Sequence, residues 1–408
     1  MRRVVVTGMG VLSPLGSGVR ENFERLHVYK NAVEEIENLK SYKGLNAHLA
    51  SLVKNFEIPE RYSRKVLRSM GPVAVMSIFV AEQALADAGI DKDSGLVRGG
   101  RLGISFGSSS GSIEPLCDFH SMISTHVVRN MTSSTYMKMM PQTTVVNISL
   151  YLKTTGRIIP SGTACTSGSL SIGYAYEAIK FGLQDVMIAG GAEEFSPTQV
   201  AIFDTLYATS TKNETPSLTP APYDKNRDGL VIGEGAGALI LEEYEHAKAR
   251  GAKIIAEVAG FATNTDGTHM TQPNAQTIQI ALEKSMQSAG IDAGQIGYVN
   301  GHGTATGQGD VAETIATAAA FKRPVPISSM KSYIGHTLGA CGAIEAAMAI
   351  EMLNKNWYAP TLNLSEVDPA CGELDYIKGE GRTIESEYVM TNNFAFGGVN
   401  TSLIFKKI

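Results

Sequence analysis

The sequence predicts an α/β fold made of two similar halves. Short apolar strands alternate with longer helical segments rich in small residues, a pattern typical of a parallel sheet with helices on its faces. The second half of the chain repeats this alternation. With 408 residues, the chain also exceeds the roughly 250–300 residues at which a single core stops growing. We therefore expect two α/β units that pack against each other.

In the first half, apolar runs predict strands at VVVTG near the N-terminus, at LGISFG around Ile104, and at DVMIAGG from 185 to 191. The stretch from Leu170 to Phe181 has the spacing of an amphipathic helix. A glycine-rich segment, 229–243, runs into an apolar strand and not into a helix. It therefore lacks the geometry that holds a dinucleotide phosphate, and NAD binding is not indicated.

The second half repeats the rhythm of strands and helices after a charged segment, EEYEHAKARGAK, that ends at Lys253. We place the boundary there, with one unit over residues 1–250 and the other over residues 251–408. The predicted elements are a strand at 253–261, a helix at 278–288, a strand at 296–303, a helix from Val311, a strand at 325–328, a helix ending at Asn354 and a final strand at TSLIFKK.

Composition and charge exclude several classes of protein. Hydrophobic residues make up 43% and charged residues 18%, so the chain is globular and not disordered. A net charge of −5 without a basic run argues against a nucleic-acid binder. No run of 18–20 apolar residues predicts a membrane span, and Arg2 to Gly8 reads as a strand and not as a signal peptide. Four cysteines without CxxC spacing indicate free thiols, no zinc site and a cytoplasmic location.

Cys165 is the first candidate for chemistry. It stands in TACTSGS directly before the predicted helix. Unpaired N–H groups and the helix dipole favour a thiolate at such a position, which would make the sulfur nucleophilic. The alternative is a buried core cysteine, the usual role of an intracellular cysteine. The local context alone leaves both interpretations open.

Two histidines are flanked by glycine at predicted strand ends. His302 lies in GHGTATGQGD after the strand around Val299, and His336 lies in KSYIGHTLGACGA between a strand and a helix. Ligands of α/β sheets bind at the carboxyl ends of strands. A single histidine is more often structural, but two of them with a helix-capping cysteine favour a catalytic site. Their spacing is not that of metal ligands.

Two further segments suit substrate binding. Thr304 and Thr306 are predicted either to bind an extended polar substrate arm or to cap the next helix. The stretch NNFAFGGVN, 392–400, predicts either a hinged loop over a pocket or a tight turn with core phenylalanines. A backbone N–H in this stretch would complete an oxyanion site.

Together, TACTSG, GHGTATGQGD, KSYIGHTLGACGAIEA and FAFGGVN resemble the β-ketoacyl-acyl-carrier-protein synthases, and most of all the type II elongation enzymes. MRRVVVTGMGVLSPLG, DVMIAGGAEE and YDKNRDGLVIGEGAG also match in the family's order, so the resemblance covers almost the whole chain. It implies a thiolase-like fold of two duplicated halves in five layers, αβαβα, and a dimer. It also implies an acyltransferase that joins an acyl chain to malonyl-acyl-carrier protein by decarboxylative Claisen condensation, giving a 3-oxoacyl product in fatty-acid elongation or a related pathway.

The resemblance assigns roles to named residues. Cys165 would accept the acyl chain, with its own N–H and that of Phe396 as the oxyanion hole. His302 and His336 would serve decarboxylation of the malonyl unit. The supporting ionic residues of the family match Lys331 and Glu345. The phosphopantetheine contacts and the gate around the substrate would be Thr304, Thr306, Phe394, Gly397 and Gly398.

The resemblance also implies what the enzyme needs from outside. Its substrates would arrive on the phosphopantetheine of an acyl carrier protein, and neither a metal nor a redox cofactor would take part. A homodimer is expected, and a heterodimer with a related ketosynthase-like subunit is the alternative. A basic cluster at Arg64, Lys65 and Arg68 would either meet the acidic carrier or form a solvated helix face.

Departures from the family pattern leave the pathway open. The gate reads FAFGG where FGFGG is common, so we expect Ala395 to stiffen it. Gly307 and Gln308 replace a usual proline, and the segment 107–119, GSSSGSIEPLCDF, is unusually polar. These changes keep a ketosynthase of a specialised polyketide or aryl polyene pathway, working with a chain-length-factor-like partner, as the alternative.

Two other classes fit the sequence less well. A catalytically silent partner subunit would lack the nucleophilic Cys165. A degradative thiolase would need a second catalytic cysteine late in the chain, and Cys371 stands in an acidic loop without a glycine-rich turn.

Overall fold

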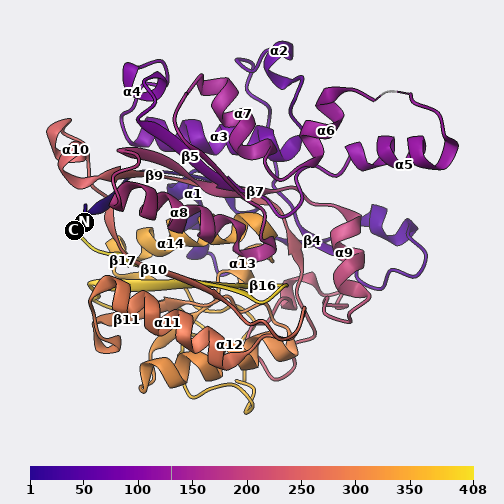
Figure 1. The fold of residues 1–408 in the computed structure, drawn as a ribbon. Helices are drawn as coiled ribbons and strands as arrows, with labels where there is room; N and C mark the ends of the chain where they lie inside the picture. The colour runs from indigo at the N-terminus through magenta and orange to yellow at the C-terminus, as the bar shows by residue number, and fades with distance from the viewer. Residues whose placement is uncertain (130) are drawn as a thin grey trace.

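The computed structural model describes residues 1–129 and 131–408 and confirms an α/β fold with two similar halves (Figure 1). In the N-terminal half the strand order is β6-β5-β7-β9-β1. The first three strands are parallel, β9 is antiparallel to β7, and β1 is antiparallel to β9. In the C-terminal half the order β12-β11-β16-β17-β10 has the same directions, and β14 extends its edge. This repeated topology confirms the duplication. The strands of these orders are β1 Val4–Ser13, β5 Leu102–Gly107, β6 Ile158–Ser161, β7 Val186–Glu193, β9 Gly235–Glu243, β10 Ala256–Thr265, β11 Ile296–Asn300, β12 Pro326–Ser328, β14 Asp375–Tyr376, β16 Tyr388–Ala395 and β17 Val399–Lys406.

The two halves stack as five layers, as the family resemblance implied. Figure 1 shows α8 and α14 between the sheets and further helices on both outer faces. The sheets join at one end, where β1 pairs with β10. The inner layer is α8 Ser167–Lys180 and α14 Cys341–Lys355; the outer layers contain α3 Pro72–Asp87 and α7 Thr143–Leu152 on one side, and α11 Ala275–Ala289 and α12 Gly307–Phe321 on the other.

The inner helices cross at very short range. A Cβ atom added to Gly342 would lie 2.5 Å from the backbone nitrogen of Ser169, and one added to Gly168 would lie 2.9 Å from that of Ala343. Only glycine permits this approach. Both helices are buried on most sides, which explains why α14 is apolar nearly all round. The crossing brings the first turns of α8 and α14 together in the centre of the molecule.

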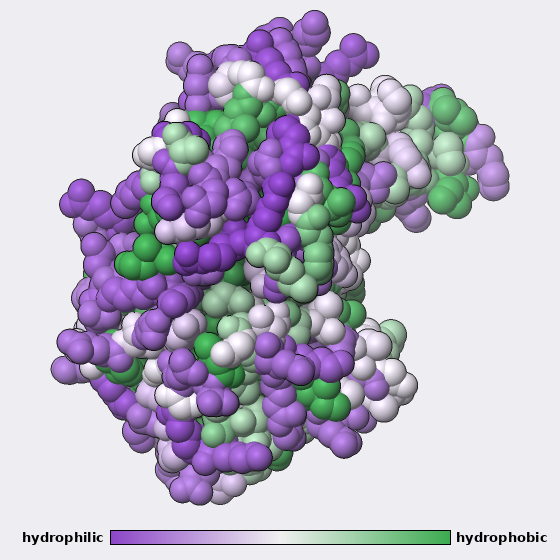
Figure 2. Space-filling view, turned by 60° about the vertical axis from the view of Figure 1, so that its left-hand side comes forward, coloured by the Kyte–Doolittle hydropathy of each residue, from purple (hydrophilic) through white to green (hydrophobic). Residues whose placement is uncertain are grey.

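An arm projects from the N-terminal half. It consists of α5 Pro115–Thr125 and α6 Ser133–Met139, which extend away from the body in Figure 1. Hydrophobic side chains gather on this arm in Figure 2. The neighbouring strand β6 lies at the edge of its sheet. The exposed apolar residues of the arm and of β6 are Leu116, Ile123, Val127, Val128, Tyr136 and Ile158.

The predicted elements exist, and their ends differ by a few residues. The helix predicted from Leu170 begins at Ser167, and the helix predicted from Val311 begins at Gly307. Among the helices of the described residues, none is long and apolar enough to cross a membrane. The remaining helices are α1 Val19–Leu26, α2 Arg64–Leu67, α4 Gly95–Arg98, α9 Pro197–Asp204, α10 Tyr244–Ala249 and α13 Lys331–Ile334; the short strands are β2 Gly16–Ser17, β3 Val33–Glu35, β4 Leu49–Ser51, β8 Ile232–Gly233, β13 Trp357–Tyr358 and β15 Arg382–Thr383.

Candidate active site

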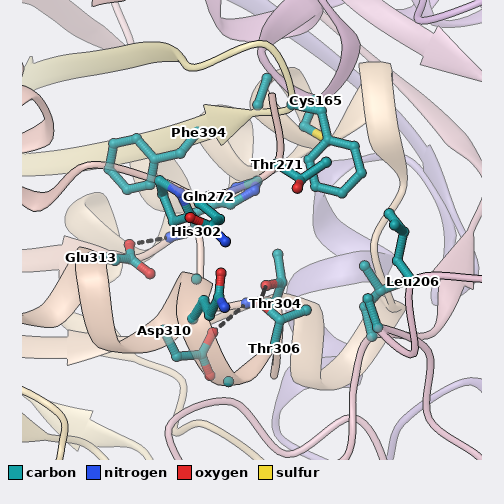
Figure 3. Close-up of a pocket in the computed structure, with 18 of the residues that line it drawn as sticks. Cys165, Leu206, Thr271, Gln272, His302, Thr304, Thr306, Asp310, Glu313 and Phe394 are labelled. Carbon is teal, nitrogen blue, oxygen red and sulfur yellow. Dashed lines mark hydrogen bonds between the residues drawn. The ribbon is translucent and has the colours of Figure 1, made fainter. Parts of the chain in front are cut away.

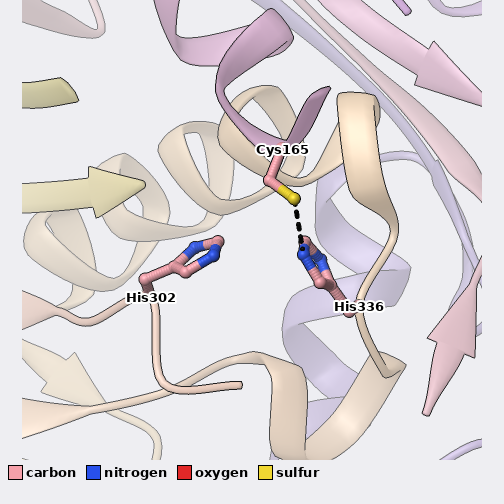
Figure 4. A group of neighbouring side chains, drawn as sticks. All are labelled: Cys165, His302 and His336. Carbon is pink, nitrogen blue, oxygen red and sulfur yellow. Dashed lines mark hydrogen bonds between the residues drawn. The ribbon is translucent and has the colours of Figure 1, made fainter. Parts of the chain in front are cut away.

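Cys165 lies in the turn that connects β6 to the central helix α8. The turn is a 3₁₀ helix over Ala164–Thr166, and Ala164 adopts the left-handed conformation with φ 48°. The Cys165 side chain is only 5% exposed. Its sulfur lies 3.0 Å from Nε2 of His336, as Figure 4 shows. The structure therefore brings together a cysteine and a histidine that are 171 residues apart in the sequence.

The expected thiolate at Cys165 needs a correction. Burial raises the pKa of the Cys165 thiol to about 12, the positive charge of Lys331 lowers it, and the charge of Glu193 raises it. The backbone N–H groups of Cys165 and Phe396 lower the pKa as well, because both face the sulfur. Loss of solvent thus outweighs the charge of Lys331 and the two N–H groups, and the pKa of the thiol is raised where a lowered one was expected.

His336 is held as a neutral ring with its proton directed at the sulfur. Burial, and then the charge of Lys331, hold its pKa well below the usual range. The backbone N–H of Leu338 donates to Nδ1 at 3.3 Å, so Nδ1 is the acceptor and Nε2 carries the proton. His336 Nε2 therefore donates to the sulfur of Cys165.

His302 has the same tautomer for a different reason. Lys331 Nζ lies 3.1 Å and Asn393 Nδ2 lies 3.3 Å from its Nδ1, and both are donors. Burial, followed by the charges of Lys331 and His336, holds the pKa of His302 well below the usual range. The two histidine rings meet edge to face with centroids 5.2 Å apart (Figure 4). Both Nε2–H groups are therefore available as neutral donors near Cys165.

A buried ion pair between Lys331 and Glu345 lies next to His302. Lys331 Nζ lies 2.5 Å from Glu345 on α14, and Asn393 Nδ2 donates to the other Glu345 oxygen at 2.8 Å. Burial alone would lower the pKa of Lys331, but the charge of Glu345 offsets burial and the pKa is raised. Lys331 is thus a permanent cation beside His302. The sequence did not single out Asn393, which contacts both Glu345 and His302.

Cys165, His302 and His336 also have the proximity of a metal site, because one ligand atom from each lies within 4.8 Å of the others. A histidine that binds metal normally donates its other ring N–H to an acceptor. Here Nδ1 of His302 faces Lys331 and Nδ1 of His336 faces the Leu338 N–H, which are donors. The surrounding groups therefore suit hydrogen-bond donation and do not fit a metal ion.

The FAFGGVN stretch forms a tight hairpin turn whose tip lies over the site. Gly397 and Gly398 have φ of 89° and 74°, which favours glycine at both positions. The Phe396 ring packs against Phe203 at 5.0 Å, and the Phe394 ring lies 5.8 Å from His302. Ala395 ends β16 and pairs with Val399, so alanine fits its extended backbone.

Thr304 and Thr306 line the entrance to the site, as Figure 3 shows. Their hydroxyl oxygens lie 2.9 Å apart. Thr306 occupies the position before α12, but its side chain makes no capping hydrogen bond. The structure therefore disfavours the helix-capping interpretation of Thr306 and leaves its hydroxyl to the cavity.

Two carboxylates that the sequence analysis missed hold the His302 loop. Glu313 accepts hydrogen bonds from the N–H groups of His302 and Gly303. Asp310 accepts them from the N–H groups of Thr304 and Ala305 (Figure 3). Burial raises the pKa of Asp310 to about 6 and that of Glu313 to about 7. Their spacing of three residues on α12 was a usable signal, since it places both on one helix face.

A cavity of 480 Å³ connects these groups to the surface. Its size is in the range of small-ligand sites. It extends from the nucleophile between the gate and the threonines, and the 269–273 segment also lines it. The predicted site residues on its wall are Cys165, His302, His336, Thr304, Thr306, Phe394, Phe396 and Gly398; Lys331 and Glu345 lie behind the histidines.

The buried carboxyl group of Glu193 should make the stability of the protein depend on pH. It ends β7 and accepts the N–H groups of Ser109 and Gly339, and burial raises its pKa to about 7 from 4.5. The folded protein therefore binds this proton more tightly than the unfolded chain does. The resulting stability is present at acid pH and is lost as the pH rises through 7.

We expect Glu193 to lower the free energy of unfolding by about 2 kcal/mol between pH 5.5 and 8, opposite in sign to the contribution of the buried His302 and His336, whose pKa values are held low. In urea unfolding, the free energy of wild type minus that of Glu193→Gln should fall by this amount over the same pH range, whereas the difference between wild type and Glu60→Gln on the surface should stay constant. An unchanged slope in Glu193→Gln would refute the raised pKa.

Comparisons with known proteins agree with this geometry. Residues 1–247 match the family model "Beta-ketoacyl synthase, N-terminal domain", and residues 255–365 match "Beta-ketoacyl synthase, C-terminal domain". A 3-oxoacyl-[acyl-carrier-protein] synthase 2 of Vibrio cholerae is 40% identical, covering 100% of this chain and 99% of the relative.

Two solved structures extend the comparison. A β-ketoacyl synthase from Burkholderia phymatum has a TM-score of 0.98 and 55% identity and covers 100% of both chains. A type II PKS acyl-carrier protein in complex with its ketosynthase, bound to the hexaketide, has a TM-score of 0.88 and 28% identity and covers 100% of this chain and 99% of that one. The two family models span most of the chain, and the fold and the full-length relatives agree with them. The chain therefore belongs to the β-ketoacyl synthase family of condensing enzymes.

Proposed function

We propose that the enzyme condenses an acyl chain held on Cys165 with malonyl-acyl-carrier protein and releases carbon dioxide and 3-oxoacyl-acyl-carrier protein. The observation that carries this proposal is the approach of His336 Nε2 to the Cys165 sulfur, with the neutral ring of His302 beside it. A nucleophile and two neutral N–H donors in one buried site suit a condensation that passes through an enolate.

In the first half-reaction, the sulfur of Cys165 attacks the carbonyl carbon of the acyl thioester. The thiol proton passes to the departing carrier thiolate, and the acyl group becomes a thioester of Cys165. The negative oxygen that develops would be bound by the backbone N–H groups of Cys165 and Phe396, both of which face the sulfur. This step divides the condensation into two easier reactions.

In the second half-reaction, the malonyl thioester loses carbon dioxide, and its C–C bonding electrons form an enolate. The enolate oxygen would accept hydrogen bonds from Nε2 of His302 and His336, which are neutral donors. The enolate carbon then attacks the Cys165 thioester and expels the thiolate, which takes up a proton. Donors fixed before the reaction need no reorganisation when charge develops.

The other site residues would orient the reacting groups. Lys331 and Glu345 are proposed to fix the tautomer of His302. Thr304 and Thr306 would hydrogen-bond the phosphopantetheine arm in the cavity entrance, and Phe394, Gly397 and Gly398 would form the gate over it. We propose that no metal or redox cofactor is needed, since the substrates bring the carrier's phosphopantetheine with them.

Product formation tests the function directly. Wild-type protein incubated with hexanoyl- and malonyl-acyl-carrier protein should give 3-oxooctanoyl-acyl-carrier protein and one carbon dioxide per product. Mass spectrometry of the carrier follows the ketoacyl product, and carbon dioxide release is measured separately. Condensation of two acyl thioesters without malonyl donor would instead indicate a thiolase, and absence of product with every donor would overturn the proposal.

A specialised pathway is the second candidate function. The 28% identical ketosynthase of a type II PKS complex and the polar segment 107–119 favour it. A preference of wild-type enzyme for polyketide or polyene acyl donors over saturated ones would select it over fatty-acid elongation.

The proposed function also predicts two kinds of partner, an acyl carrier protein and a second subunit. An acyl carrier protein would dock at the cavity mouth, and the free thiols suit the reducing cytoplasm as the place of action. The projecting arm and the edge strand β6 expose apolar side chains that a second subunit would cover.

We expect a dimer, about twice the 43.5 kDa of the chain, in light scattering of the purified protein. Replacing Ile123 and Val128 with lysine should shift the mass toward the monomer, whereas Lys153→Glu should not. A wild-type monomer that dimerises only with a related subunit would indicate the heterodimer, and a monomer in both cases would refute the dimer.

A further inference from the structure

Large apolar side chains lie at the mouth of the cavity that leads to Cys165. Leu206 (Figure 3), Tyr207 and Met270 all line this cavity, and they are 46%, 90% and 72% exposed. A side chain that lines a cavity and also faces the solvent lies at its opening. A molecule that enters the cavity from outside therefore passes these three side chains.

The apolar surface continues from the mouth onto α9. Ile202 is 57% exposed and precedes Leu206 by four residues. The Leu206 N–H still donates to the carbonyl of Phe203, so the helical turn reaches Leu206 and places it on the same side as Ile202. We call the four exposed side chains the mouth patch: Ile202, Leu206, Tyr207 and Met270.

The mouth patch lies on two sides of the gate. On the side of α9, the Phe203 ring packs against Phe396 with centroids 5.0 Å apart. On the other side, the Gly397 N–H donates to the carbonyl of Met270 at 2.8 Å. A partner that covers the patch would therefore sit over both the gate and the opening of the cavity.

Tyr207 has a backbone conformation that favours glycine. Its φ is 52°, in the left-handed region, which costs free energy in any residue with a Cβ atom. Because its side chain is 90% exposed, packing within the chain does not repay this cost. Such strain persists at positions that serve function. The fold thus presents an aromatic ring to the solvent where a glycine would be more stable.

The two segments that carry the patch expose almost no charge. Asp204 is the one charged residue within 201–208; it is 5% exposed and accepts hydrogen bonds from the N–H groups of Asn46 and Ala47. The segment 267–273 contains no Asp, Glu, Lys or Arg. A contiguous exposed apolar patch of this kind is typical of an interaction site.

Two partners of the proposed function would fit an apolar surface, and the position of the patch chooses between them. A second subunit seated here would stay over the opening and block the delivery of acyl thioesters to Cys165. An acyl carrier protein brings the acyl group itself and leaves after the transfer. Its phosphopantetheine arm would enter through the opening that the patch surrounds.

We infer that the mouth patch is a docking contact of the acyl carrier protein, and that it fits a carrier whose surface beside the phosphopantetheine is apolar. The inference rests on the proposed function, because it requires substrates that arrive on a carrier. Four side chains make a small contact area, and small interfaces are typical of transient complexes.

The preference for a carrier-borne substrate measures this contact. It is the ratio of kcat/KM for hexanoyl-acyl-carrier protein to kcat/KM for hexanoyl-pantetheine, with acylation of Cys165 followed by intact-mass spectrometry. Tyr207→Ala and Ile202→Ser should each lower the ratio by about five- to tenfold, mainly through the KM of the carrier substrate. The loss should be the same at about 0.05 M and about 0.5 M salt, because salt screens charges and not apolar contacts.

Two further variants separate docking from structure. Tyr29→Ala is the matched control, since Tyr29 also has a positive φ of 53° and is 39% exposed, but lies outside the described lining of the cavity. It should keep the wild-type ratio. Tyr207→Gly relieves the strained backbone, so it should melt no lower than wild type and yet lose the ratio as Tyr207→Ala does.

An unchanged ratio in both Tyr207→Ala and Ile202→Ser, or an equal loss in Tyr29→Ala, would overturn the inference while the proposed function stands. A shift of Tyr207→Ala from dimer to monomer in light scattering would assign the patch to a second subunit and would also overturn it. If wild type formed no adduct with either thioester, the acyl-enzyme step would fail and the inference with it.

Discussion

Cys165→Ala is expected to abolish condensation, lowering the rate of product formation by at least about 10³-fold, because Cys165 is the one thiol among the described residues that line the cavity. Intact-mass spectrometry after incubation with acyl-carrier thioesters should show an acyl adduct on wild type and none on the variant. The neutral histidines are unchanged by the substitution. The variant should therefore still release carbon dioxide from malonyl thioester without forming a ketoacyl product.

Cys117→Ala is the matched control, since Cys117 is exposed on the arm. It should keep both the adduct and the product. An adduct that persists in Cys165→Ala would assign the nucleophile to another residue, with the buried Cys341 as the first to examine, because its Sγ lies 3.2 Å from the carbonyl oxygen of Cys165.

His302→Ala is expected to slow malonyl decarboxylation by about 10²–10³-fold, the usual effect of removing one oxyanion donor. Acyl transfer to Cys165 should fall far less, because His302 makes no hydrogen bond to the sulfur, whereas His336 does. Carbon dioxide release and the rate of the Cys165 adduct separate the two half-reactions. His120→Ala, at an exposed position of α5, serves as control.

His336→Ala tests the same division of roles between the two half-reactions. We expect it to suppress decarboxylation as His302→Ala does, with acyl transfer spared in comparison. Because His336 contacts the sulfur directly, its effect on acyl transfer should be the larger of the two. Equal loss of both half-reactions in His302→Ala would show that the roles have been divided wrongly.

Much of the fold was predictable because strand and helix periodicities are local signals. The alternation of apolar strands and small-residue helices indicated duplicated α/β halves, and the strand orders confirm the duplication. The family resemblance, and not periodicity, gave the five layers. Element ends differed by a few residues, as at Ser167, where α8 begins, because tertiary packing decides where the terminal turns of a helix form. The division at residue 250 stays a prediction.

The site was predictable only where a residue's own context carries a signal. Cys165, His302 and His336 stand at strand ends beside glycines, and the structure brings them together. Asn393 lies within a strand, and only the fold shows that it contacts Glu345 and His302.

The helix-terminus argument for Cys165 failed for a related reason. Helix position is a local property that the sequence reveals, whereas the burial that raises its pKa depends on the whole fold. The same limit explains why Glu193 was missed, since the N–H groups it accepts come from loops far apart in the chain.

The tight crossing of α8 and α14 sets the gap between nucleophile and donor. Cys165 precedes α8 by two residues and His336 precedes α14 by five, so a wider crossing would separate sulfur and ring. Any side chain at Gly168 or Gly342 would force such a separation, because its Cβ atom would lie within 3 Å of the backbone of the other helix. Relatives with this crossing would keep the same reaction while diverging in what they build. Substitutions at the gate and on α9 would then change which acyl chains are joined. The central pair of helices would keep the catalytic groups at a fixed separation.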